Sequence, residues 1–157
     1  MEMVVVIFIL GLAALLVFPL LPSTDASNLK DSARRLATVI RYLGERSVTT
    51  KTPYRMNLDI SGGGVTVKKI VNGEETTPED PFFSRGILAD GVSIEDIEIP
   101  RLGKVAEGVF NVGFGVAGLD DFLVIHLKGT KGGEFTVTAL PQGGRVEVLE
   151  GYQEITP

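Results

Sequence analysis

The sequence contains no cysteine, no tryptophan and a single histidine, His126, among its 157 residues. Without cysteine, disulfide frameworks, thiol nucleophiles and cysteine-ligated zinc or iron–sulfur sites are excluded. One histidine excludes two-histidine metal motifs, and any Ser-His-Asp triad would depend on His126 alone. An enzyme also needs a cleft with acid and base groups, whereas the carboxylates here are scattered along the chain. The composition therefore predicts a protein that is not an enzyme and has no cofactor.

Charge is absent from 22 consecutive positions, residues 3–24, and is unevenly divided beyond them. Residues 25–55 carry seven basic and three acidic side chains, whereas residues 56–157 carry eight basic and sixteen acidic ones. An acidic head argues against nucleic acid as a partner, and a basic neck suits anionic lipid headgroups or acidic proteins.

Residues 1–24 predict a transmembrane helix. At about 1.5 Å per residue, 22 uncharged residues reach roughly 33 Å, against a bilayer core of about 30 Å. The acidic Glu2 and the long apolar run favour a retained anchor over a cleaved signal peptide. The basic residues that follow the span would place the head in the cytoplasm, unless basic residues precede Met1 in the natural precursor.

A second helical pattern covers residues 25–48. Its apolar residues recur at spacings of four and three, which places them on one face: Leu29, Ala33, Leu36, Ile40 and Leu43. This amphipathic helix is expected to bend away from the first at Pro19 and Pro22 and to pack its stripe on the head. We predict that it ends near residues 44–48, where Gly44 and the following β-branched run weaken it.

From residue 49 to residue 157 the pattern changes to the alternation typical of strands. Strands are predicted at residues 54–60, 65–71, 92–99, 109–116, 122–128, 134–140 and 145–149, of which the first two form a hairpin and the last three a meander. The predicted fold class is α+β: an antiparallel sheet of six or seven strands with the amphipathic helix on one face. Residues 72–91 are predicted to be a long loop whose Phe82 and Phe83 tuck into the head, with contact to a partner as the alternative.

The polar candidates on the head are all interpreted as structural. His126 lies in the middle of a predicted strand, with no acidic residue at a useful spacing. The carboxylates at positions 90, 95, 96 and 98 are predicted to form a solvated face, because they lack the pattern of a calcium loop. Asp120 and Asp121 are interpreted as turn residues, and the glycine clusters as hairpin glycines rather than phosphate loops.

Glu2 differs from these candidates in kind. A carboxylate at the start of a long apolar helix lies either in the headgroup layer or, if apolar residues precede it, inside the membrane, where it needs a cationic partner. The sequence by itself leaves both alternatives open.

Residues 2–19 resemble the N-terminal helix of type IV pilins and type II secretion pseudopilins. That family has a glutamate, an apolar run and a helix-bending proline seventeen positions later, which Glu2 and Pro19 reproduce. A looser similarity to the H-type (GspH/FimT-like) minor pseudopilins, a group that includes minor pilins, rests on three segments: Ser32-Ala33-Arg34-Arg35-Leu36-Ala37, Phe114-Gly115-Val116-Ala117-Gly118 and Gly144-Arg145-Val146. Val116 stands where that group often has proline.

The resemblance implies a structural subunit of a periplasmic fibre. The chain would be a single-pass protein of the bacterial inner membrane with its head in the periplasm. It would then assemble at or near the tip of a type II secretion pseudopilus that exports folded proteins through the outer membrane. Glu2 and Pro19 would be the assembly and subunit-binding residues, with the Glu2 carboxylate pairing with the N-terminal amine of a neighbouring subunit. Phe114, Gly118, Gly144 and Arg145 would be structural residues of the motif.

The implied partners are other minor and major pseudopilins, the inner-membrane assembly platform and membrane lipid. A prepilin peptidase joins them if the precursor carries a basic leader before Glu2, and the processed N-terminus would then be methylated. Two alternatives stay open: a minor pilin of a type IV pilus, and an unrelated membrane-anchored periplasmic binding module.

Overall fold

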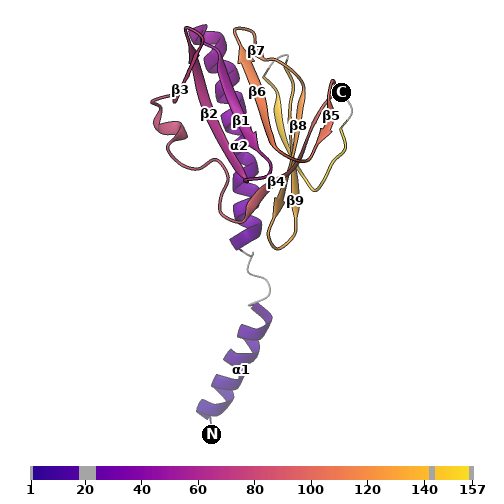
Figure 1. Ribbon diagram of the computed structural model, residues 1–157. Helices are drawn as coiled ribbons and strands as arrows, with labels where there is room; N and C mark the ends of the chain where they lie inside the picture. The colour runs from indigo at the N-terminus through magenta and orange to yellow at the C-terminus, as the bar shows by residue number, and fades with distance from the viewer. Residues whose placement is uncertain (1, 18–23, 142–143, 156–157) are drawn as a thin grey trace.

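A computed structural model describes residues 2–17, 24–141 and 144–155. Within them lie two long helices, α1 (Glu2–Val17) and α2 (Thr24–Thr50), followed by a β-rich head with a short 3-10 helix, η2 (Pro81–Phe83). Figure 1 shows α1 apart from the head and α2 running along it. The predicted bend falls at Pro19 and Pro22, which lie outside the described residues.

Helix α2 buries the predicted stripe completely: Leu29, Ala33, Leu36, Ile40 and Leu43 are all in the core. The helix continues past Gly44 to Thr50, two residues beyond the range of 44–48 near which its end was predicted. Side-chain hydroxyls bond back to the preceding turn, with Ser47 Oγ donating to the Gly44 carbonyl at 2.9 Å. The helix as a whole contacts both sheets, and these tertiary contacts stabilise it despite the weak helix propensity of its last residues.

The head consists of two five-stranded antiparallel sheets. The first has the order β3-β2-β1-β6-β7, with β3 (Glu74–Thr76), β2 (Gly64–Val71), β1 (Tyr54–Asp59), β6 (Val109–Gly115) and β7 (Gly118–Leu119). The second has the order β10-β9-β8-β4-β5, with β10 (Val146–Glu150), β9 (Glu134–Ala139), β8 (Leu123–Gly129), β4 (Val92–Ile99) and β5 (Gly103–Val105).

The predicted hairpin of β1 and β2 and the meander of β8, β9 and β10 are confirmed. The prediction of one sheet with six or seven strands is wrong in two respects. Strands β3, β5 and β7 have two or three residues each, too few to show an alternating pattern. The division into two sheets comes from long-range pairing, because β6 pairs with β1 whereas β4 pairs with β8.

Helix α2 holds the two sheets together. It contacts β6 and β7 of the first sheet and β8, β9 and β10 of the second (Figure 1). The buried apolar side chains of both sheets meet the α2 stripe in a single core, to which Met56, Phe114 and Ile125 contribute. Burial of this shared core is what joins the helix to the head.

Candidate functional site

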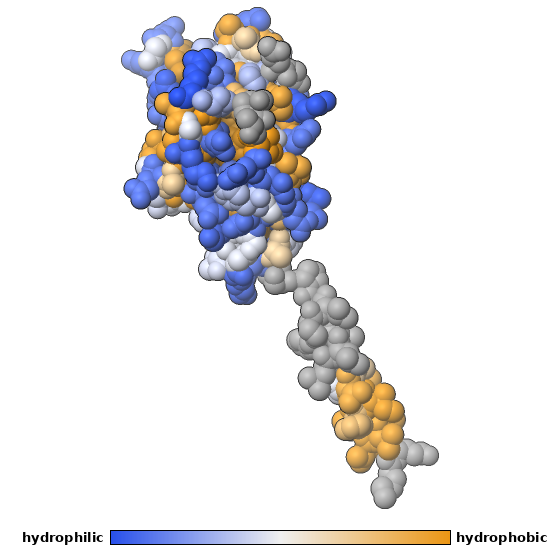
Figure 2. All heavy atoms as spheres, turned by 90° about the vertical axis from the view of Figure 1, so that its right-hand side faces the viewer, coloured by the Kyte–Doolittle hydropathy of each residue, from blue (hydrophilic) through white to orange (hydrophobic). Residues whose placement is uncertain are grey.

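Helix α1 exposes apolar side chains on all sides. Its described side chains, residues 3–13, are all exposed, including Ile7, Phe8 and Leu10. Figure 2 shows the coloured part of this helix as hydrophobic, in contrast to the mixed surface of the head. A helix that is apolar all round needs apolar surroundings, either lipid or other helices. No helix in the described part of the chain is long and apolar enough to cross a membrane.

The structure does not describe the side chains of the two predicted assembly residues, Glu2 and Pro19. Glu2 is the first residue of α1, and its side chain is not described. Pro19 lies outside the described residues. The assembly roles of both residues therefore stay predictions.

Two of the four motif-matching residues, Phe114 and Gly118, lie on β6 and β7 of the first sheet. The other two, Gly144 and Arg145, lie just before β10 of the second sheet. Phe114, on β6, is 1% exposed and pairs with Tyr54 on one side and Leu119 on the other. Gly118 has a φ of +104°, a region that favours glycine, and so allows the tight connection between β6 and β7.

Gly144 also has a positive φ, of +62°. Arg145 lies on the surface, with its Nε 3.8 Å from Glu147 Oε1. An exposed pair at this distance contributes little to stability. The Arg145 carbonyl accepts from the Leu140 N–H at 3.0 Å, across the β9–β10 connection. The structural roles of the four residues in the motif stay predictions.

Gly118 and Gly144 line the same groove, of about 380 Å³, along the second half of α2. Strand β7 of the first sheet and the β9–β10 connection of the second sheet form its two sides, and α2 forms its floor. The lining is mainly apolar, with Ile40, Val48 and Leu119 beside the charged Arg41 and Glu45. The Arg41 guanidinium donates to the Val146 carbonyl at 3.2 Å and so ties the helix to the edge strand β10.

A buried polar cluster lies in the second sheet, where the sequence pattern predicted a solvated acidic face. Asp96 is 4% exposed and His126 is fully buried, with Nδ1 of the ring 2.6 Å from Asp96 Oδ1. The prediction is therefore wrong for Asp96. His126 lies within its strand as predicted, but it has an acidic partner, which the spacing in the sequence did not indicate. The carboxylate of Asp96 is covered by His126 and Tyr152, which are distant in the sequence, and a β-bulge at Glu95 shifts the register between Ile94 and Asp96.

The bulge reverses the alternation of β4. It keeps Ile97 and Ile99 on the core face and turns Asp96 toward its cross-strand partner His126. The spacing of three between the buried Ile94 and Ile97, in a strand of period two, is the signal that reveals such a bulge in the sequence.

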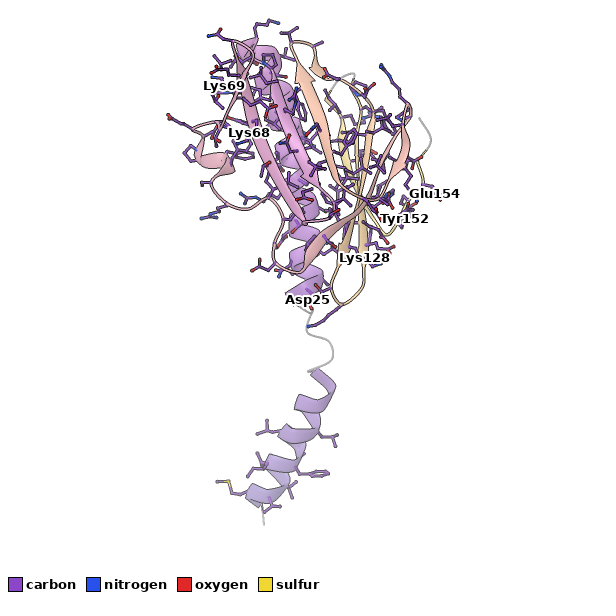
Figure 3. All side chains as sticks on the ribbon, in the orientation of Figure 1. Asp25, Lys68, Lys69, Lys128, Tyr152 and Glu154 are labelled. Carbon is purple, nitrogen blue, oxygen red and sulfur yellow. The ribbon has the colours of Figure 1, made fainter. Side chains whose placement is uncertain are left out.

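Two further groups complete the cluster. The Tyr152 ring stacks on the His126 ring with centroids 3.8 Å apart, and its hydroxyl donates to Asp96 Oδ2 at 3.1 Å. Lys104 on β5 contacts the Tyr152 hydroxyl, and its Nζ lies 3.7 Å from Asp96 Oδ2. Burial raises the pKa of Tyr152, and the hydrogen bond with Tyr152 raises the pKa of Lys104. Tyr152 lies on the side of this sheet away from α2 (Figure 3).

A second polar contact docks the loop before β4 onto α2. The Tyr42 hydroxyl donates to Asp80 Oδ2 at 2.5 Å, and Asp80 Oδ1 accepts from the Phe82 backbone at the start of η2. These bonds lower the pKa of Asp80, and the first of them raises the pKa of Tyr42. The Tyr42 ring lies 4.7 Å from the Phe82 ring and 5.8 Å from the Phe83 ring, centroid to centroid. The prediction that these phenylalanines tuck into the head is confirmed.

The remaining acidic candidates have local partners. Asp121 Oδ1 lies 3.2 Å from Arg101 Nη2 on the surface, and Asp120 donates its backbone N–H to the Gly113 carbonyl at 3.1 Å. Glu95 pairs with Lys128 at 3.1 Å. These contacts are those of turns and strand surfaces, in agreement with the structural interpretation of Asp120 and Asp121.

Comparison with solved structures identifies the fold. No protein-family model and no curated protein sequence matches the chain. Two structures of the minor pseudopilin EpsH from the type II secretion system of Vibrio cholerae match it, with TM-scores of 0.61 and 0.64 at 16% and 14% identity. They cover 78% and 82% of this chain, and 97% and 98% of their own chains.

The type IV minor pilin FimU of Pseudomonas aeruginosa matches with a TM-score of 0.53 at 16% identity, over 83% of this chain and 93% of its own. These neighbours are pilin-like subunits rather than enzymes. The chain therefore has the fold of the minor pseudopilin EpsH and the minor pilin FimU, which confirms the resemblance to pilin-like proteins at the level of the fold.

Proposed function

We propose that this protein is a minor subunit of a pilin-like fibre, and specifically an H-type minor pseudopilin of a type II secretion system. One observation carries the proposal: a helix with exposed apolar side chains on every side precedes a head with the fold of EpsH. In this proposal the head lies outside the membrane. Helix α1 mediates assembly, because it exchanges contacts with lipid for contacts with the helices of neighbouring subunits.

The proposed location follows from the same helix. Residues 1–24 anchor the chain in the inner membrane, the head lies in the periplasm, and the assembled subunit lies at or near the tip of the pseudopilus. Its partners are other minor and major pseudopilins, the assembly platform and membrane lipid. If the precursor carries a leader before Glu2, a prepilin peptidase processes it and the resulting N-terminus is methylated.

Two features favour a secretion pseudopilus over a type IV pilus. The sequence has no cysteine and hence no large disulfide loop of the kind that major pilins carry. The head is acidic, with sixteen acidic and eight basic residues in positions 56–157, which opposes the capture of DNA by electrostatics. The minor-pilin role nevertheless shares the same fold, since FimU matches too.

The test of assembly is the variant Glu2→Ala, produced in the native host. A carboxylate inside a bundle of apolar helices is costly unless a cation neutralises it, so Glu2 is expected to pair with a neighbouring subunit's amine. We expect Glu2→Ala to stay in the membrane fraction but to co-purify with other pilin-like subunits at a level at least several-fold lower. Met3→Ala, a truncation of an exposed apolar residue on the same helix, is the matched control.

Co-purification of Glu2→Ala at the wild-type level would contradict the assigned role of Glu2. Deletion of the gene separates the systems: a pseudopilin deletion leaves exported proteins in the periplasm, whereas a minor-pilin deletion reduces surface pili. An unrelated binding module would leave both unchanged. Because the chain has no cysteine, a single Val6→Cys substitution also allows oxidative crosslinking between α1 helices without background.

A further inference from the structure

The C-terminal residues 151–155 cover the face of the second sheet that points away from α2. The Gly151 N–H donates to the Glu134 carbonyl at 2.8 Å, which extends the pairing of β10 with β9. Beyond it, Thr136 Oγ1 donates to the Gly151 carbonyl at 2.8 Å and accepts from the Gln153 N–H at 2.9 Å. Thr136 is fully buried beneath this segment. We call residues 151–155 the tail.

The tail also provides one of the two hydrogen-bond partners of the buried His126 ring. The Gln153 carbonyl lies 3.1 Å from His126 Nε2, while Asp96 Oδ1 lies 2.6 Å from His126 Nδ1. A carbonyl oxygen accepts only, so Nε2 must carry a hydrogen. The short distance at Nδ1 requires a second hydrogen between the ring and the carboxyl group, on either atom. The docked pair thus holds one proton more than a neutral imidazole beside a carboxylate.

Release of the tail removes the need for that proton. With the Gln153 carbonyl absent, water can donate to Nε2, and a neutral ring can donate from Nδ1 to an ionised Asp96. Every polar group then has a partner without the additional proton. Docking of the tail and binding of one proton are therefore linked: acid favours the docked tail, and rising pH favours its release.

We propose that the tail is a proton-operated latch, held closed by the additional proton of the His126–Asp96 pair, which lets Nε2 donate to the Gln153 carbonyl, and opened when the pair loses that proton. Opening exposes the face of the second sheet around His126 and Thr136, which the tail otherwise covers. This role goes beyond the assembly function and does not depend on it, since every contact lies within the head.

Other charged groups face the pair and moderate the linkage. Lys104 on β5 approaches Asp96 and is bonded to Tyr152, and Glu154 of the tail favours the charged form of Lys104. Lys128 is two residues from His126 on β8 but is paired with Glu95. In the released state the ring keeps the hydrogen at Nδ1 and accepts a hydrogen bond from water at Nε2, so the proton that distinguishes the two states is the one at His126 Nε2.

Hydrogen exchange of the full chain in detergent micelles, followed by mass spectrometry between about pH 5 and pH 9, tests the latch. After correction for intrinsic exchange rates, we expect the protection of a peptide spanning residues 151–155 to fall with rising pH, approaching tenfold per pH unit. Protection of β1 and β2 should stay constant. A pH-independent tail, or a tail whose protection rises with pH, would overturn the proposal.

The matched variant is Asp96→Asn. Its amide donates to His126 Nδ1 and accepts from the Tyr152 hydroxyl, so a neutral histidine can donate Nε2–H to Gln153 without an additional proton. We expect the tail of Asp96→Asn to be protected at every pH. The same pH slope as in the wild type would refute the assignment of the proton to this pair.

A second measurement needs no variant, and it tests the latch even if Asp96→Asn fails to fold. His126 is the only histidine in the sequence, so isotope labelling of histidine gives one set of imidazole signals. We expect the additional proton in the docked state and its loss over the same pH range as tail protection. A neutral ring protonated at Nδ1 alone, beside a protected tail, would contradict the latch.

Discussion

Truncation of Leu36 to alanine is expected to destabilise the head, because Leu36 belongs to the core that α2 shares with the sheets. Leu36 is 0% exposed in the middle of α2 and lies among the largest fully buried side chains of the described residues. Leu36→Ala removes three carbons from a core shared by the helix and both sheets. Helix backbone on one side and sheet on the other limit the collapse of the resulting cavity.

The size of the effect follows from this confinement. Buried leucine-to-alanine substitutions cost about 2–5 kcal/mol, with the larger values where the site cannot collapse. We expect about 3–4 kcal/mol for Leu36, a large fraction of the roughly 5–15 kcal/mol that stabilises a typical domain. For a domain of this size, the loss corresponds to a fall in Tm of about 10 °C or more.

Thermal unfolding of the full chain in micelles measures this loss. The three tyrosines, Tyr42, Tyr54 and Tyr152, belong to α2 and the head, and the sequence has no tryptophan, so intrinsic fluorescence reports the head without interference from α1. Arg34→Ala, two residues away on the exposed face, is the control and should change the free energy of unfolding by less than about 0.5 kcal/mol. If Leu36→Ala unfolds at the same Tm as Arg34→Ala, the assignment of α2 as the shared core element is wrong.

Three further predictions concern the head. A fragment beginning at Asn28 retains Leu29, the first buried residue of the helix stripe, and should be soluble and folded with a β-rich circular dichroism spectrum; aggregation or a mainly helical spectrum would contradict this. Gly118→Ala places a side chain at a φ of +104° and should cost about 1–3 kcal/mol in chemical denaturation, whereas the control Gly64→Ala, with open space at its Cβ, should cost less. Tyr42→Phe removes the bond that lowers the pKa of Asp80. In the wild type, the stability from that bond is present above the unfolded pKa of the carboxyl group and is lost as the pH falls through its lowered folded value. The variant's free energy of unfolding should therefore decline less on acidification, and an unchanged pH profile would refute the linkage.

The spacing of apolar residues in the sequence predicted the helices and the long strands. The stripe of α2 was predictable because helical spacing places its five residues on one face whatever they pack against. The long strands were predictable for the same reason at period two, and the exposed apolar α1 follows from a run of residues with no polar face. The N-terminal pattern of Glu2 and Pro19 pointed to the pilin-like fold without any knowledge of the head.

Pairing between distant segments determined the rest. Helix α2 continues past Gly44 to Thr50 although the local propensity is weak there, and strands of two or three residues form where neighbouring strands complete their hydrogen bonds. The cluster of Asp96, His126 and Tyr152 joins residues up to 56 positions apart through one bulge and one tail. Local periodicity is fixed by the chain itself, whereas the partner of a buried polar group is decided by which strands lie side by side, and that is a property of the tertiary structure alone.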